Sequence, residues 1–136
     1  MTALLALLVL LAPQAPSRWP VESLTVEGNS RYPAERVLAA AGLALGQEVG
    51  KEELEAAMAR LAESGHFVSA GYHYRPSASG KGYQVTIEVA EIEETYPLRF
   101  ERLDAPARDL EEWLRRFDPL FAGAVPGTEE CLARYA

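Results

Sequence analysis

The chain has 136 residues, which is enough for one small domain with additional segments, and its 49% hydrophobic and 24% charged residues are ordinary for a globular protein. The formal net charge of −7 argues against a general nucleic-acid binder and against a polybasic membrane-surface anchor, because both need clustered Lys and Arg. The single cysteine, Cys131, excludes an intrachain disulfide and a cysteine zinc cluster.

The N-terminus carries an unbroken apolar run, ALLALLVLLA, over residues 3–12. A membrane-spanning helix needs about 20 such residues, whereas the core of a signal peptide needs about 7 to 15. A buried core helix is the alternative, although nothing precedes the run to pack around it. We expect residues 1–20 to form a signal-peptide-like segment with a proline-rich linker, and the protein to be exported.

After the linker, the sequence indicates a first strand that ends in a sharp turn. Residues 21–28, VESLTVEG, alternate apolar and polar side chains as a half-buried strand does. Gly28-Asn29 is typical of a hairpin turn, because both residue types adopt positive φ readily. However, the next residues are helix formers, and Pro33 suits a first helical position. The pattern predicts a sharp turn at Gly28 and Asn29 that leads into a short helix.

A second helix and two strands come next. Residues 51–65 give the strongest helix signal, with apolar residues at the i, i+4, i+7 spacing and Gly65 as the turn that ends it. Residues 67–75 predict a weaker strand, in which Gly71 suggests a bulge or the close approach of another backbone. Residues 83–91, YQVTIEVAE, alternate cleanly and predict a strand with one apolar face.

These elements predict an α+β fold for residues 21–91, in the order β-α-α-β-β. Two helices would cover one face of a three-stranded sheet and leave the other face in water. The pattern then begins again, with a strand expected over residues 97–103, a helix over 107–117 and a further helix capped by Thr128. We therefore expect residues 92–136 to be the start of a second, truncated unit of the same kind, in tandem with the first.

Residues 21–91 resemble a POTRA (polypeptide-transport-associated) domain in the order and spacing of four stretches. These are VESLTVEGN, AAAGLALGQ, LEAAMARLAESGHFVSAGYHY and YQVTIEVAE. Two departures are His66, where that corner often has Tyr, and Pro33-Ala34, where a Ser or Thr cap is common. Residues 92–136 look like the start of a second such domain, although Leu103-Asp104-Ala105 stands where a Gly-Asn turn would be expected.

The resemblance implies a periplasmic scaffold of an outer-membrane protein assembly or polypeptide translocation factor in a Gram-negative-type bacterium. Its implied partners are unfolded outer-membrane polypeptides or assembly partners, with a C-terminal membrane barrel outside this chain. Two alternatives remain open. One is a divisome-type POTRA protein that acts by partner binding, and the other is the interaction domain of a larger protein whose enzymatic part is missing.

No catalytic, metal or cofactor site is expected. Four serines are candidates by residue type only: Ser64, Ser69, Ser77 and Ser79. No nucleophile elbow surrounds any of them, and His66 and His73 do not have a zinc-binding spacing. Glu91, Glu93 and Glu94 are interpreted as a solvated acidic linker rather than a cation site. We therefore expect no enzyme, no cofactor and no nucleic-acid partner.

Binding is expected at a sheet edge, because the unpaired N–H and C=O groups of an edge strand accept an extended peptide. The fold of the POTRA family implies that the second strand is the free edge. The candidate partner-binding residues are Phe67, Val68, Ser69, Ala70, Gly71, Tyr72, His73 and Tyr74. The aromatic rings of Tyr72 and Tyr74 would pack on client side chains, with a core position as the alternative for Phe67 and one tyrosine.

Overall fold

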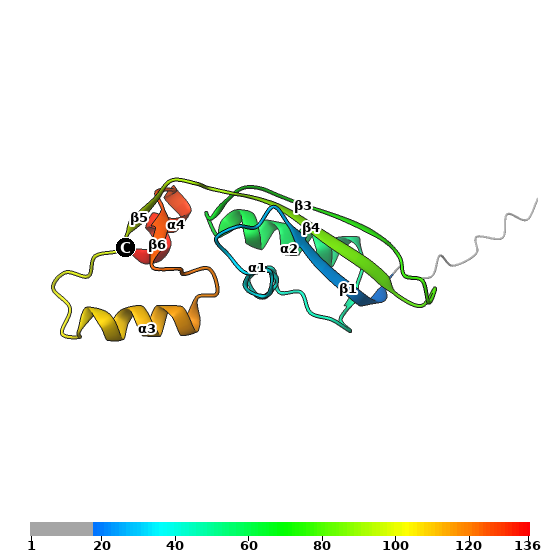
Figure 1. Ribbon diagram of the computed structural model, residues 1–136, viewed down its shortest axis with the longest axis horizontal. Helices are drawn as coiled ribbons and strands as arrows, with labels where there is room; N and C mark the ends of the chain where they lie inside the picture. Colours follow the sequence, from blue (N-terminus) through cyan, green and yellow to red (C-terminus); the bar gives the residue numbers. More distant parts are fainter. Residues whose placement is uncertain (1–17) are drawn as a thin grey trace, which may run out of the picture.

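The computed structural model describes residues 18–136, and the expected signal-peptide-like run lies outside them (Figure 1). The elements in chain order are β1 (Trp19–Glu27), α1 (Ala34–Ala41), β2 (Glu48–Val49), α2 (Lys51–Glu63), β3 (Phe67–Pro76), β4 (Tyr83–Glu91), β5 (Thr95–Pro97), α3 (Ala107–Phe117), β6 (Ala124–Pro126) and α4 (Glu129–Tyr135). None of the helices described is long and apolar enough to cross a membrane.

The main sheet has the strand order β2-β1-β4-β3. Strand β1 pairs in parallel with β4, with Val26 opposite Ile87, and β3 pairs antiparallel with β4 along its whole length. A parallel pair needs a crossover connection, and the two helices between β1 and β3 provide it. The expected α+β fold is confirmed. The two-residue strand β2 was not predicted, because two residues are too few to show any periodicity.

Helices α1 and α2 lie on the same side of the sheet (Figure 1). The clean alternation of β4 puts Val85, Ile87 and Val89 in the core beneath them, while Glu88 is exposed on the other side. From the helices, Val37 and Leu61 are completely buried against these strands. The core of residues 21–91 therefore lies between one apolar sheet face and two helices.

The C-terminal segment differs from the sequence prediction at its strands. The strand expected over residues 97–103 is wrong, because β5 ends at Pro97 and Arg102 adopts a positive φ of 59°. Strand β5 instead pairs with β6, in a stretch expected only to interrupt the helices. Helix α3 is present as expected, but none of its residues is buried, and Trp113 and Phe117 are 56% and 61% exposed.

Helix α4 joins the two parts of the chain. The Thr128 side chain caps this helix by accepting a hydrogen bond from the Cys131 N–H, and its hydroxyl also donates to the Gly65 carbonyl at 2.8 Å. A Cβ on Gly65 would lie 2.5 Å from Thr128 Oγ1, so only glycine permits this approach. The start of α4 therefore packs directly on the corner between α2 and β3.

Candidate functional site

Strand β3 forms an edge of the main sheet, and within residues 18–136 it pairs only with β4. The Ser77 N–H donates to the Gly82 carbonyl at 2.8 Å, which shows that residue 77 bonds toward the β4 side. Bonding alternates along an antiparallel pair, so the outward backbone groups of the edge belong to Ala70, Tyr72, Tyr74 and Pro76. Because proline has no N–H, three N–H and four C=O groups are directed away from the sheet.

The candidate residues at the start of β3 do not belong to this outward set. Phe67 is buried in the core, as one of the two readings of the sequence had it. The register shifts between Phe67 and Ser69, and the bulged residue between them, Val68, is 74% exposed. The bulge expected near Gly71 therefore lies at Val68, and the space where a Gly71 Cβ would stand is open rather than closely approached.

The side chains of β3 divide between the two faces of the sheet. Ala70 and Tyr72 lie on the helix side, partly packed against the core, and Tyr74 on the same side is 43% exposed. Ser69, Gly71 and His73 alternate with them and lie on the opposite face. An occupant of the edge would therefore meet two different surfaces at alternate residues.

An aromatic strip, composed of Trp19, Tyr83, Tyr74 and Tyr72, crosses the helix side of the sheet from β1 to the β3 edge. Trp19 stacks on Tyr83 with 5.4 Å between ring centroids, and Tyr83 contacts Tyr74 edge-on at 4.9 Å. Tyr74 in turn stacks with Tyr72 at 6.2 Å. The strip ends at the two tyrosines whose backbone groups face outward, so it extends the edge by an apolar surface.

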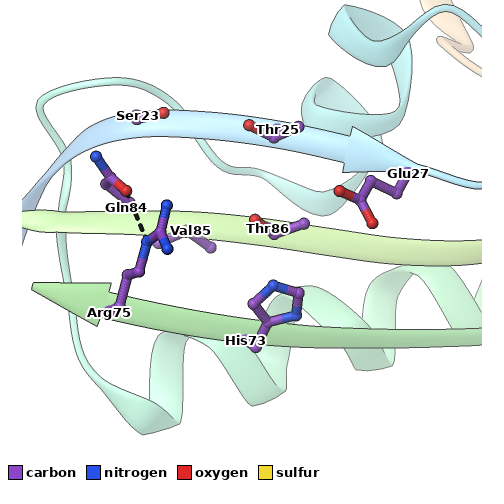
Figure 2. A pocket seen from close by; sticks show the side chains of 8 residues that line it. All are labelled: Ser23, Thr25, Glu27, His73, Arg75, Gln84, Val85 and Thr86. Atoms are coloured by element: carbon purple, nitrogen blue, oxygen red, sulfur yellow. Dashed lines mark hydrogen bonds between the residues drawn. The ribbon is translucent and has the colours of Figure 1, made fainter. Parts of the chain in front are cut away.

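The open face of the sheet, on the side away from the helices, is polar and is organised in three rows across β1, β4 and β3. The rows are Ser23–Gln84–Arg75, Thr25–Thr86–His73 and Glu27–Glu88–Gly71. Figure 2 shows the residues of the first two rows together with Glu27. Arg75 Nε donates to Gln84 Oε1 at 2.8 Å, and His73 Nδ1 lies 3.5 Å from Glu88 Oε1. Charge thus changes along the face, from a cation at Arg75 to two carboxylates in the third row.

The turn after β1 is fixed by a carboxylate from the end of β4. Gly28 has a φ of +83°, and the Asn29 side-chain amide donates to the Tyr32 carbonyl at 2.9 Å. The Glu91 carboxylate accepts backbone N–H groups of three successive residues at 2.8–3.1 Å: Ser30, Arg31 and Tyr32. Burial opposes its ionisation, but these donors hold the Glu91 pKa below its usual range. Glu91 is therefore not a solvated linker residue.

His66 is completely buried at the contact between the two parts of the chain. Its Nδ1 lies 2.8 Å from the Tyr32 hydroxyl and its Nε2 lies 3.3 Å from the Tyr135 hydroxyl, which also donates to Asp118. Because Tyr135 gives its proton to Asp118, the consistent arrangement has Nε2–H donating to Tyr135 and Nδ1 accepting from Tyr32. Burial lowers the His66 pKa to about 4, so the ring is neutral.

The sequence pattern predicted His66 at the corner after α2, but it did not predict the hydrogen bonds of His66 with Tyr32 and Tyr135. Its partners come from the turn before α1, from the residue after α3 and from the last turn of α4. No local sequence pattern brings such distant positions together. The cluster of these side chains links the turn before α1 to the residue after α3 and to the last turn of α4 through hydrogen bonds.

The serine hydroxyls serve turns and helix ends. Ser64 Oγ donates to the Leu61 carbonyl at 2.6 Å, and Ser79 Oγ contacts both Ser77 Oγ and the Glu22 carboxylate at 2.8–2.9 Å. Within residues 18–136 no group of three or more His, Cys, Asp or Glu side chains is placed to hold a metal ion. The β3 edge, with a different surface on each side, is the candidate binding site.

Comparison with solved structures identifies the fold. The chain is similar to the N-terminal domain of Omp85 from the thermophilic cyanobacterium Thermosynechococcus elongatus, with a TM-score of 0.52 and 16% identity over 85% of this chain. It is also similar to POTRA1-2 of the periplasmic domain of Omp85 from Anabaena, with a TM-score of 0.49 and 14% identity over 75% of this chain. The likeness to the Thermosynechococcus structure confirms the POTRA fold expected from the sequence.

The chain covers 47% of the Thermosynechococcus structure and 67% of the Anabaena one. No protein-family description matches the sequence, and no curated protein matches it either. The likeness to the Thermosynechococcus structure therefore shows the fold of this chain and not its role.

Proposed function

We propose that this chain is a periplasmic POTRA module of an outer-membrane protein assembly or polypeptide translocation factor. It acts as a non-enzymatic scaffold that binds extended segments of unfolded clients or partner proteins by adding them as a strand to the β3 edge. Residues 21–91 form one POTRA domain, and residues 92–136 belong to the beginning of a second. The shared fold with the N-terminal domain of Omp85 supports this role.

The observation that carries the proposal is the row of outward backbone groups at Ala70, Tyr72 and Tyr74. Main-chain hydrogen bonds supply most of the affinity in strand addition, so many sequences can bind. Such tolerance suits a module that handles different unfolded chains. The bulge at Val68 limits the accessible edge to the following residues, because a bulge twists an edge out of a straight pairing register.

A proline at Ala70 tests the proposal. The Ala70→Pro variant loses an outward N–H, while the bonds between β3 and β4 come from its neighbours, so we expect the fold to survive and peptide binding to fall at least about tenfold. NMR titration with a soluble peptide of about ten residues, the length of a membrane-spanning strand, measures the effect. Ala70→Ser keeps the N–H at similar size and should bind as the unmodified chain does. Undiminished binding by a folded Ala70→Pro variant would contradict the proposal.

A further inference from the structure

An extended segment added to β3 has its side chains placed by the backbone alternation of the edge. Residues of the added strand opposite Tyr72 and Tyr74 lie on the helix side, next to the aromatic strip. Residues opposite Gly71, His73 and Arg75 lie on the open face. The two sets alternate along the segment, so each position meets a defined chemistry.

The helix-side positions favour large apolar residues. Tyr74 contacts Tyr72 and Tyr83 and still has 43% of its surface exposed, so part of its ring is available to a neighbouring strand. Tyr72 is half-buried and supports Tyr74 from within the same strand. Cross-strand pairs between aromatic and β-branched or aromatic side chains stabilise adjacent strands. Two such residues, two positions apart, would match the two tyrosines.

On the open face, the surface next to the β3 edge is positive near Arg75 and negative near Gly71, where Glu88 is the next side chain. Arg75 uses its Nε to bond Gln84, and no partner of its two terminal nitrogens is found among the described residues. At the other end Gly71 has no side chain, and the next residue in its row is Glu88, whose side chain is 58% exposed, followed by Glu27. A long basic side chain opposite Gly71 can therefore reach across it to the Glu88 carboxylate. His73 lies between these ends and already contacts Glu88.

We infer that the β3 edge selects partner segments by the order of their charges. The favoured segment reads, from its N-terminus, acidic residue, large apolar residue, any residue, large apolar residue, basic residue. This order follows from antiparallel addition, which is slightly the more stable pairing and places the acidic residue opposite Arg75 and the basic residue opposite Gly71. The inference rests on the proposed function, because it names the partner chemistry of the same edge.

Two peptides of identical composition test the inference, one with the acidic residue first and one with the two charges exchanged. Exposed ion pairs are individually weak, so we expect the unmodified chain to bind the acidic-first peptide about threefold to tenfold more tightly at low salt. The double variant R75E/E88K exchanges the charges of the protein and should reverse this preference. A third peptide with serine at both apolar positions should bind more weakly than the acidic-first one.

The outcomes separate the two claims. If both charged peptides bind equally to the unmodified chain and to the double variant, while Ala70→Pro weakens the binding of both at least about tenfold, strand addition stands and the charge order is overturned. If none of the peptides binds, the proposed function fails and the inference with it. Should the double variant not fold, Arg75→Gln replaces it, because this exposed substitution should reduce the preference and a folded variant with an unchanged preference would contradict it.

Discussion

Replacing Gly28 by alanine is expected to destabilise the fold by about 2–4 kcal/mol. Gly28 has a φ of +83°, and a Cβ built on it would lie 2.0 Å from the carbonyl oxygen of Val89. This carbonyl belongs to the backbone of β4 and cannot move aside as a flexible side chain can. Either the turn or the end of β4 must shift, which would also disturb the Glu91 contacts with residues 30–32.

Gly80→Ala is the matched control for Gly28→Ala. Gly80 also has a positive φ, of +69°, but nothing lies within 4 Å of the position its Cβ would take. The free energy of unfolding of Gly80→Ala should therefore fall only by the cost of the positive φ, about 1 kcal/mol. Urea unfolding of the two variants measures the difference. Equal losses would show that the close approach to Val89 has no energetic consequence and would contradict the structure of this turn.

The buried His66 is expected to make stability fall as the pH falls. Its pKa is lowered to about 4 in the folded protein, against 6.5 for the free group, so the unfolded chain takes up the proton first. The stability that the neutral His66 ring contributes is fully present above the unfolded pKa, and it is lost as the pH falls to the folded pKa. The shift corresponds to about 3 kcal/mol between these limits. Asp118, Arg134 and Arg31 are the charged groups that act on the ring.

Unfolding free energies measured by urea between about pH 7 and pH 4 test the His66 prediction. Carboxylates titrate in part of the same range. The informative quantity is therefore the slope of the unfolding free energy against pH, compared between the unmodified chain and His66→Gln, whose residue 66 cannot titrate. His73→Gln makes the same substitution at the other histidine, whose side chain is 60% exposed on the open face, and controls for the general effect of replacing a histidine. Identical slopes for His66→Gln and the unmodified chain would contradict a neutral, buried ring.

Sequence patterns predicted the elements that are long enough to show a full period of apolar and polar residues. Strand β4 alternates strictly because one face meets the helices and the other meets water, and α2 repeats its apolar residues because one side packs on the sheet. Strands β2, β5 and β6 have two or three residues each and show no period. Their pairing depends on where the rest of the chain folds, so a sequence pattern cannot find them.

The candidate edge was predicted through a family resemblance. The strand register in the structure then determined which backbone groups of β3 are directed outward. Sequence alone does not say which β3 residues direct their backbone outward, because a shift of one residue exchanges the two sets. The Glu91 and His66 contacts were missed for a related reason. Glu91 bonds residues about sixty positions earlier in the chain, and His66 bonds Tyr32, 34 positions earlier, and Tyr135, 69 positions later.

Amide hydrogen exchange along β3, with and without the acidic-first peptide, tests most directly whether this edge binds extended segments. In the free protein the amides of Gly71, His73 and Arg75 should be protected by β4, while those of Ala70, Tyr72 and Tyr74 should exchange rapidly. Peptide at saturating concentration should slow exchange at Ala70, Tyr72 and Tyr74 and leave the other three as they were. Binding that leaves these three amides fast, or that protects α3 instead, would contradict the account.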